Sequence, residues 1–361
     1  MAAYPKRRIG NDLVSASGLG CMSMAIEYPS RPLNDEESLQ VLTAAADMGV
    51  SFWDTSDAYG NNEQLIGRWF KETGRRDEIF LATKFGIRRE DGKMTVNGSP
   101  EYVKEACAAS LERLGTDCID LYYQHRVDST VPIEKTVQAM AELKAEGKIR
   151  YLGLSECSAT TLRRACKVHP IAAAQMEFSP FALEIESPET DFLRTAREVG
   201  VKIVVYAPLG KGFLTGAIRS RADMDPQDVR FMMHPRFSDE NFDGNLKLVD
   251  GFDALAKKKG CTIGQLAIAW VMAQGEGEYQ CSSSAKPCAY DSFVTDFIPI
   301  PGTKTLKYMK ENAGAALVNF TAEDEREVRS MLERVGGAKG ARYPAAVLAG
   351  CFGDSPELED E

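Results

Sequence analysis

Short apolar runs alternate with amphipathic stretches along most of this chain, and that alternation limits its possible folds more than any other feature. The runs that read as strands are residues 17–22, 51–55, 79–86, 119–125, 151–156, 172–178, 202–210 and 297–302. They are too uniformly apolar for a sheet with one face in water, which indicates parallel strands covered on both faces. Residues 34–49, between two of the runs, show helix signals, with Asn34 as the N-cap and Gly49 as the stop.

Eight such units close into a barrel more naturally than into an open doubly wound sheet. An open sheet usually carries G-x-G-x-x-G after its first strand, whereas Gly18 and Gly20 lack the third glycine and the following helix. We therefore predict an α/β protein, a (β/α)8 TIM barrel over residues 7–340, with an N-terminal β-hairpin from Arg7 to Val14 and long loops at the C-terminal face. The tail, residues 341–361, is expected to lie over or near the active-site face.

Two segments break the alternation. Residues 217–246 are predicted to form a long polar loop after the seventh strand, of a length that is usually functional or disordered. Residues 276–296 are rich in Ser, Cys and Gly, have no periodicity, and form an atypical insertion before the eighth strand. Without residues 277–295 the preceding helix would run directly into that strand, so a retained short intron and a genuine loop both remain open.

Composition narrows the class of protein. The formal net charge of -10 over 361 residues makes nucleic acid and anionic membranes poor partners. Since no apolar run has the length of a signal peptide or membrane span, we expect a cytoplasmic protein. The nine cysteines are scattered and odd in number, which favours reduced thiols, and with only three histidines a metal site is not expected.

Chemically useful side chains stand at the ends of six predicted strands. They are Asp54, Lys84, His125, Ser155, Gln175 and Tyr206. Each alone has a structural interpretation, such as a helix cap for the first of them. In a (β/α)8 barrel, however, the C-terminal strand ends carry the active site, and six such residues at the same end favour a functional site.

Tyr59, on the loop after Asp54, makes the chemistry more specific. A tyrosine hydroxyl, with an ordinary pKa of ~10, donates a proton near neutral pH only if its phenolate is stabilised. A buried Lys84 ammonium would stabilise it, and Asp54 would keep that ammonium charged and oriented. His125 could hydrogen-bond the same substrate oxygen. Such a site protonates an oxygen without an acyl nucleophile or a metal, so a nicotinamide cofactor would have to supply the hydride.

These residues and their spacing resemble the aldo-keto reductase superfamily, whose members are (β/α)8 NADPH-dependent carbonyl reductases. The matching motifs are DTSDAYGNNEQLIG, ATKFG, IDLYYQHRVD, IRYLGLSECS, QMEFS, YAPLGKGFLTG and IPIPGTK, with EN at 311–312. The ending RYPAAVLAGCFGDSPEL is most similar to the microbial and plant branch of pyridoxal reductase-like and auxin-induced-type reductases. By this resemblance the catalytic residues are Asp54, Tyr59, Lys84 and His125.

The resemblance also implies a binding site for NADPH/NADP+. Its residues would be Met22, Asp54, Ser155, Gln175, Tyr206, Pro208, Leu209, Gly210, Arg236, Gly302, Thr303, Lys304, Glu311 and Asn312. Ser155 and Gln175 would hold the carboxamide, and Tyr206 would stack on the nicotinamide ring. Lys304, Lys307 and Arg236 would bind the 2'-phosphate. Two positions depart from the family pattern: Glu156 stands where the family usually has Asn, and Thr305 where related chains often have Arg.

The predicted function is the NADPH-dependent reduction of an aldehyde or ketone to the alcohol, with a small-molecule carbonyl substrate and the proton from Tyr59. The alternative is a cofactor-binding regulatory subunit similar to potassium-channel beta subunits, which keep the same catalytic residues. Superfamily members that reduce carbon-carbon double bonds have Glu in place of His125, so carbonyl reduction is favoured. The sequence leaves the substrate and the oligomeric state open.

Overall fold

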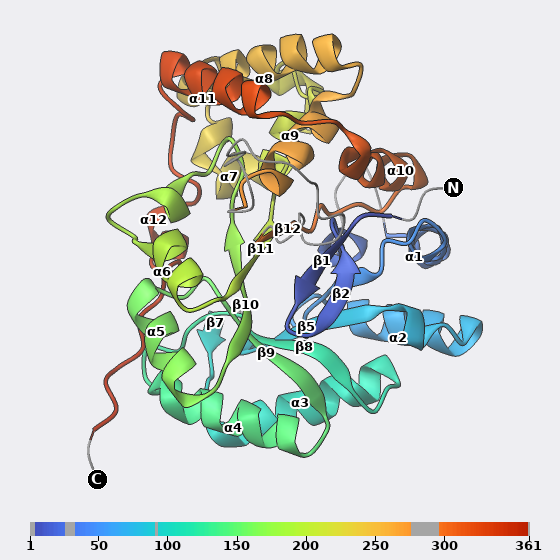
Figure 1. The fold of residues 1–361 in the computed structure, drawn as a ribbon, viewed down its shortest axis with the longest axis vertical. Coiled ribbons are helices and arrows are strands. Elements are labelled where there is room, and N and C mark those ends of the chain that lie inside the picture. The colour runs from blue at the N-terminus through green and yellow to red at the C-terminus, as the bar shows by residue number, and fades with distance from the viewer. Residues whose placement is uncertain (1–3, 26–32, 91–92, 276–295, 360–361) are drawn as a thin grey trace, which may run out of the picture.

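A computed structural model describes residues 4–25, 33–90, 93–275 and 296–359, and its centre is one parallel sheet (Figure 1). The strand order is β12-β11-β10-β9-β8-β5-β4-β3. The strands are β3 (Leu19–Gly20), β4 (Phe52–Asp54), β5 (Phe80–Phe85), β8 (Ile119–Gln124), β9 (Ile149–Ser155), β10 (Ile171–Glu177), β11 (Lys202–Tyr206) and β12 (Phe297–Pro299). Each coincides with one of the predicted apolar runs.

The sheet closes because two edge strands meet through glycines. The amide of Gly18 donates to the carbonyl oxygen of Pro299 at 2.8 Å, and that of Gly20 donates to Pro301 at 3.2 Å. A β-carbon at Gly20 would lie 2.7 Å from the carbonyl oxygen of Ile300, so a larger residue would hold the edges apart. The predicted (β/α)8 barrel is confirmed.

Helices surround the strands (Figure 1). They are α1 (Asp35–Asp47), α2 (Asn62–Thr73), α3 (Pro100–Leu114), α4 (Ile133–Ala145), α5 (Ala159–Val168), α6 (Phe192–Glu198), α7 (Arg230–Met233), α8 (Asp239–Lys259), α9 (Ile263–Met272), α10 (Leu306–Gly314), α11 (Ala322–Val335) and α12 (Ala345–Leu348). Local chemistry sets their ends: the Asn34 side chain accepts from the amide of Glu37 at 3.2 Å, as an N-cap should. No helix in these described ranges is long and apolar enough to cross a membrane.

A hairpin covers one end of the barrel. Strands β1 (Lys6–Ile9) and β2 (Asp12–Ser15) pair antiparallel, which confirms the predicted N-terminal hairpin. Ile9 and Val14 are fully buried and pack with Phe52 and Leu121 from the inside of the barrel. The hairpin therefore excludes water from the end of the barrel opposite the strand ends that carry the candidate site.

One local prediction needs correction, and another falls almost wholly outside the described residues. The segment 217–246 is not a loop throughout, because α7 interrupts it and α8 begins at Asp239. Phe242 explains the early start of α8: its ring packs on that of Phe213, with centroids 5.0 Å apart, and apolar burial stabilises the first turns. The predicted insertion lies outside the described residues except for Asp296.

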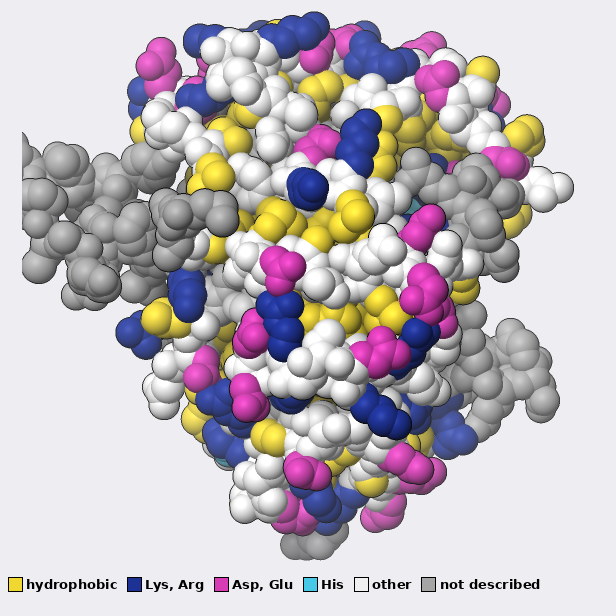
Figure 2. Space-filling view, turned by 90° about the vertical axis from the view of Figure 1, so that its right-hand side faces the viewer, with side chains coloured by type: hydrophobic (Ala, Val, Ile, Leu, Met, Phe, Trp, Pro, Cys, Tyr) yellow, Lys and Arg dark blue, Asp and Glu magenta, His cyan; other side chains and the backbone are white. Residues whose placement is uncertain are grey.

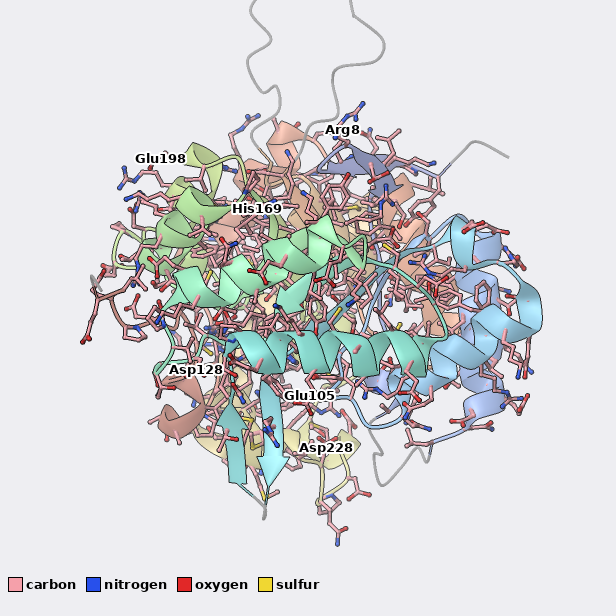
Figure 3. All side chains as sticks on the ribbon, turned by 90° about the horizontal axis from the view of Figure 1, so that it is seen from below. Arg8, Glu105, Asp128, His169, Glu198 and Asp228 are labelled. Atoms are coloured by element: carbon pink, nitrogen blue, oxygen red, sulfur yellow. The ribbon has the colours of Figure 1, made fainter. Side chains whose placement is uncertain are left out.

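A second hairpin, β6 (Ile87–Glu90) with β7 (Lys93–Val96), follows β5 and was not predicted. It projects beyond α3 in Figure 3, near the labelled Asp128, whose carboxylate accepts from the amide of Gly98 at 2.7 Å. The polar composition of this stretch concealed its strand character.

On the face drawn in Figure 2, basic and acidic side chains are interspersed.

Gly67 in α2 provides a stability test of this packing. Alanine in a helix interior ordinarily stabilises by ~1 kcal/mol relative to glycine. Here a β-carbon would lie 2.5 Å from the carbonyl oxygen of Arg113 on the neighbouring α3. We predict that Gly67→Ala lowers the free energy of unfolding by about 1–3 kcal/mol, measured by urea denaturation.

Gly244→Ala in α8 is the matched control, because its β-carbon would meet only the flexible side chain of Lys339. This variant should be neutral or slightly more stable than the parent. A stabilising effect of both substitutions would show that the contact between α2 and α3 is not limiting.

Candidate active site

A buried ion pair joins the ends of two neighbouring strands. Lys84 on β5 is fully buried, and its Nζ lies 2.5 Å from Oδ1 of Asp54 at the end of β4. The same ammonium donates to the carbonyl oxygen of Thr55 at 2.7 Å. Gln175, from β10, donates to Oδ2 of Asp54 at 2.7 Å. Both carboxylate oxygens therefore have partners, which a buried charge requires.

The two charges perturb each other's protonation in a defined way. Burial raises the pKa of Asp54, and the Lys84 ammonium and the Gln175 amide oppose that rise. Burial would lower the pKa of Lys84, but the neighbouring Asp54 and Tyr59 outweigh burial and raise it. Lys84 is therefore a permanent cation at neutral pH.

Tyr59 and His125 lie against this pair. The Lys84 Nζ is 5.0 Å from the centroid of the Tyr59 ring. The Tyr59 and His125 rings meet edge to face, with centroids 5.6 Å apart and an angle of 85° between their planes. The structure thus brings together all four residues predicted to be catalytic.

The pKa of Tyr59 differs from the expectation. We predicted that Lys84 would lower it, and Lys84 does act in that direction. Burial has the larger effect, however, so the net pKa of the Tyr59 hydroxyl is raised. The hydroxyl therefore keeps its proton at neutral pH, and the Lys84 charge is the largest influence that favours release of that proton.

His125 is held neutral and is oriented by a residue that was not predicted. Burial, and then the charges of Lys84 and Arg126, lower the pKa of His125 well below its ordinary value. The hydroxyl oxygen of Ser56 lies 3.0 Å from Nδ1 of His125 and 3.2 Å from Oδ1 of Asp57. The polar run after Asp54 was the available signal for Ser56, but only the fold brings it against His125.

The predicted cofactor residues fall into groups along the strand ends. Ser155, Gln175 and Tyr206 belong to the consecutive strands β9, β10 and β11, and Pro208, Leu209 and Gly210 follow the last of these. Met22 begins a short 3-10 helix, Met22–Met24, directly after β3 and is exposed. Gly302 pairs with Gly20 of β3, and Thr303 and Lys304 continue from it toward α10, which carries Glu311 and Asn312.

The surroundings of Gly302 fit a polar ligand. The hydroxyl of Ser23 is buried there without a hydrogen-bond partner among the described residues. A β-carbon at Gly302 would lie 3.7 Å from it. A buried hydroxyl without a partner is costly, so a bound group with polar atoms would complete this part of the site. Ser23 was not predicted.

The hydrogen-bond partners of Arg236 do not include residues of α10 within the described ranges. Its guanidinium pairs with Glu184 at 3.1 Å and donates to the carbonyl oxygen of Gly340 at 3.1 Å. These partners place it beside the C-terminal segment. Glu311 contacts the start of α9 instead, accepting from the Thr262 hydroxyl at 2.7 Å.

Glu156, which departs from the family pattern, is fully buried and paired. Its carboxylate accepts from both terminal guanidinium nitrogens of Arg342, each at 3.3 Å, and from the Tyr206 hydroxyl at 2.9 Å. A second buried carboxylate, Glu177, pairs with Lys211 at 3.0 Å. Arg342 and Lys211 were missed, because nothing local in the sequence indicates which acids they meet.

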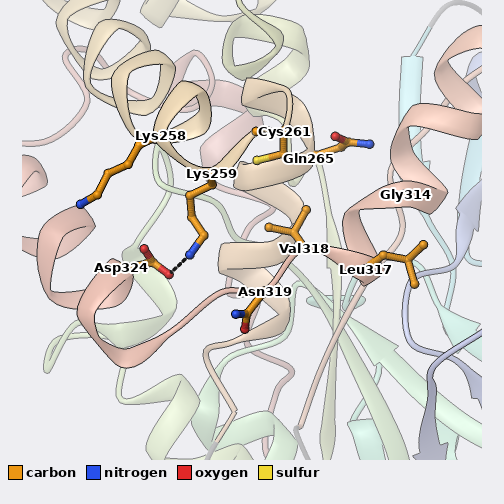
Figure 4. A pocket seen from close by; sticks show the side chains of 10 residues that line it. Lys258, Lys259, Cys261, Gln265, Gly314, Leu317, Val318, Asn319 and Asp324 are labelled. Carbon is orange, nitrogen blue, oxygen red and sulfur yellow. Dashed lines mark hydrogen bonds and ion pairs between the residues drawn. The ribbon is translucent and has the colours of Figure 1, made fainter.

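A pocket of about 620 Å³ lies elsewhere, between the end of α8 and the starts of α9 and α11 (Figure 4). It contains the ion pair of Lys259 with Asp324, whose Nζ and Oδ2 are 2.5 Å apart. None of the predicted site residues lines it. Volume alone therefore does not locate the site in this fold.

The fold and the site together define a class: a (β/α)8 barrel in which a buried lysine–aspartate pair lies beside a tyrosine and a neutral histidine at the C-terminal strand ends. The family model described as "Aldo/keto reductase family" matches residues 18–333. The chain belongs to the aldo/keto reductase family of oxidoreductases.

Known proteins of this family are similar over nearly the whole chain. The aldo-keto reductase str7 of Strobilurus tenacellus is 49% identical over 360 residues, 98% of each chain. The Schizosaccharomyces pombe aldo-keto reductase yakc, whose name specifies NADP(+), is 47% identical over 360 residues, 99% of each chain. The glycerol dehydrogenase AKR11B4 of Gluconobacter oxydans is a solved structure with a TM-score of 0.75 and 25% identity, covering 92% of this chain and 96% of its own.

Asp57 beside Ser56 gives a prediction about pH. Burial, and then the nearby Glu63, raise the pKa of Asp57 to about 7. A raised folded-state pKa means that its contribution to stability is complete below the ordinary value and is lost as pH rises toward 7. Asp57→Asn should therefore raise the melting temperature more at pH 8 than at pH 5.

Thermal unfolding at both pH values checks this prediction. Asp117→Asn, at an exposed position, is the control for the loss of one negative charge. Equal shifts of the Asp57 variant at the two pH values would contradict the prediction.

Proposed function

We propose that this protein reduces an aldehyde or ketone to the alcohol with NADPH. When bound, NADPH supplies the hydride for such a reduction. The observation that carries the proposal is the contact of the Lys84–Asp54 pair with Tyr59 and His125. Membership of the aldo/keto reductase family and the NADP(+) in the name of the fission yeast relative support it.

In this proposal the side chains share one proton transfer. Tyr59 donates its proton to the substrate oxygen, and the Lys84 ammonium stabilises the phenolate that remains. Asp54 keeps that ammonium charged and oriented through the 2.5 Å contact. His125 is neutral because of its burial. Its Nε2 donates to the same oxygen in the tautomer in which Nδ1 accepts from Ser56, and the single Ser56 proton is then directed to His125 rather than to Asp57.

The predicted cofactor residues would line the remaining strand ends. Ser155 and Gln175 would hold the carboxamide, and Tyr206 would pack against the nicotinamide ring. The backbone after β11 would approach the pyrophosphate, and the group from Gly302 to α10 would hold the adenosine half. The Ser23 hydroxyl beside Gly302, which has no hydrogen-bond partner among the described residues, supports a ligand in that last region.

A cytoplasmic location and a relation to the pyridoxal reductase-like and auxin-induced-type branch remain predictions. The seven cysteines within the described ranges are free thiols, as a reducing compartment would keep them. The deciding experiment for function is NADPH oxidation with a panel of aldehydes and ketones. NADPH binding without turnover of any of them would favour the regulatory-subunit alternative.

Tyr59→Phe tests the proton donor. It keeps the ring and removes the hydroxyl, so the rate of reduction should fall by ~10² to 10⁴-fold while NADPH still binds. Steady-state kinetics and NADPH titration by fluorescence measure the two effects. Activity within threefold of the parent would remove Tyr59 from the mechanism.

Lys304→Ala tests cofactor choice. A charge-assisted hydrogen bond to the 2'-phosphate contributes ~1.5 to 3 kcal/mol, so kcat/KM with NADPH should fall by about 10-fold or more. The value with NADH should change little, because NADH lacks that phosphate. Lys310→Ala, at an exposed position on α10, is the control. An equal loss with both cofactors would show that Lys304 does not read the phosphate.

A further inference from the structure

A group of buried charges lies next to Tyr206, at the mouth of the barrel. We call it the C-terminal clamp; its members are Glu156, Glu177, Tyr206, Lys211, Arg342 and Tyr343. Glu156 directly follows β9 and Glu177 ends β10, whereas Arg342 and Tyr343 follow α11. Glu156, Glu177 and Arg342 are 0%, 2% and 3% exposed, so these charges have no access to water that could replace a missing partner.

Arg342 neutralises both carboxylates from outside the barrel. Its terminal nitrogens lie 3.3 Å from the two oxygens of Glu156, in a two-point contact, and one of them lies 3.5 Å from Glu177. Lys211 completes the charge balance at 3.0 Å from Glu177. Arg342 is the cation within hydrogen-bond distance of Glu156 in the described part of the chain, and the charge of Arg126 also acts on that carboxylate from farther away.

Two members of the clamp, Glu156 and Lys211, contact Tyr206. The Tyr206 hydroxyl donates to the same Oε1 of Glu156 that Arg342 contacts, at 2.9 Å. The Lys211 ammonium lies 5.3 Å from the centroid of the Tyr206 ring and donates to the Tyr343 hydroxyl at 2.9 Å. The orientation of the ring thus depends on where the Glu156 carboxylate is held.

The C-terminal segment that carries Arg342 also hydrogen-bonds to the backbone of Glu156. Its φ of +49° is a left-handed conformation that costs free energy for a residue other than glycine. The amide of Gly353 donates to its carbonyl oxygen at 2.7 Å. Farther along, Arg164 donates to the carbonyl oxygens of Ser355 and Pro356 at 3.0 and 2.7 Å. Figure 1 shows this C-terminal segment, in red, running past α6 and α5.

We propose that Arg342 is a positioning residue, which holds the Tyr206 ring through Glu156 in the orientation that receives the nicotinamide. This inference rests on the proposed function, because it takes Tyr206 as the cofactor-facing ring. Hydride transfer is sensitive to small displacements of the reacting atoms. The C-terminal segment would therefore affect the chemical step without touching the substrate.

The test compares two arginines that hold the same segment. Arg342→Met removes the guanidinium that pairs with Glu156 and keeps an aliphatic side chain in its place. Arg164→Met releases the segment at Ser355 and Pro356 and leaves Glu156 and Tyr206 untouched, so it is the control for loosening alone. We expect Arg342→Met to lower kcat about 10-fold, since a shift of ~1 Å can cost ~10²-fold. The deuterium isotope effect on kcat with 4-deuterated NADPH should rise, and Arg164→Met should leave both unchanged.

Binding gives a readout that does not depend on turnover. The emission of bound NADPH should shift in Arg342→Met and stay like the parent's in Arg164→Met, because only the first change disturbs the ring at the nicotinamide. Glu156→Gln in the Arg342→Met background should restore the parent's emission and isotope effect. The amide still accepts from the Tyr206 hydroxyl and no longer requires a cation.

The outcomes separate the two proposals. Equal effects of Arg342→Met and Arg164→Met, or no recovery in the double variant, would overturn the positioning role while reduction by the parent stands. A parent that binds NADPH but reduces no carbonyl would overturn the proposed function, and the emission data alone would then decide the role of Arg342. A parent that does not bind NADPH would overturn both.

Discussion

The ion pair between Lys84 and Asp54 is the interaction on which the candidate site depends. Removing two charges from water costs several kcal/mol per ion, and leaving one partner alone in the interior costs about 3–5 kcal/mol. The pair can form because β4 and β5 pair with Asp54 opposite Ala82. Lys84 is two residues farther along β5, so its side chain lies on the same face of the sheet as that of Ala82. The position of the Lys84 charge relative to Tyr59 therefore depends on the geometry of the barrel strands.

Barrel closure places distant parts of the chain around that pair. Gly18 and Gly20 accept the close approach of the strand that precedes Gly302, so the first and last strands become neighbours. Gln175 reaches the Asp54 carboxylate for the same reason, since side chains from strands far apart in sequence converge inside a closed barrel. An open sheet would leave these groups on separate edges.

The mouth of the barrel holds a second set of buried charges with a different origin. Lys84 and Asp54 both belong to the barrel strands, whereas Arg342 arrives from the segment after α11 to meet Glu156. The first pair is rigid because both partners lie on strands. The second joins a strand end to the segment after α11, which couples that segment to Tyr206 through Glu156.

The sequence by itself determined the eight strands, most helices and the residues at the strand ends, because hydrophobic period, caps and turn residues act locally. It also indicated that Asp54 needed a cation, and Lys84 stood on the adjacent strand. It could not indicate that Arg342 forms the ion pair with Glu156, since any of the 43 Lys and Arg residues could pair with a buried acid. The sequence also did not show that burial affects the pKa of Tyr59 more strongly than the Lys84 charge does. Tertiary structure decided these matters, because charge pairing and desolvation depend on where the chain returns after closing the barrel.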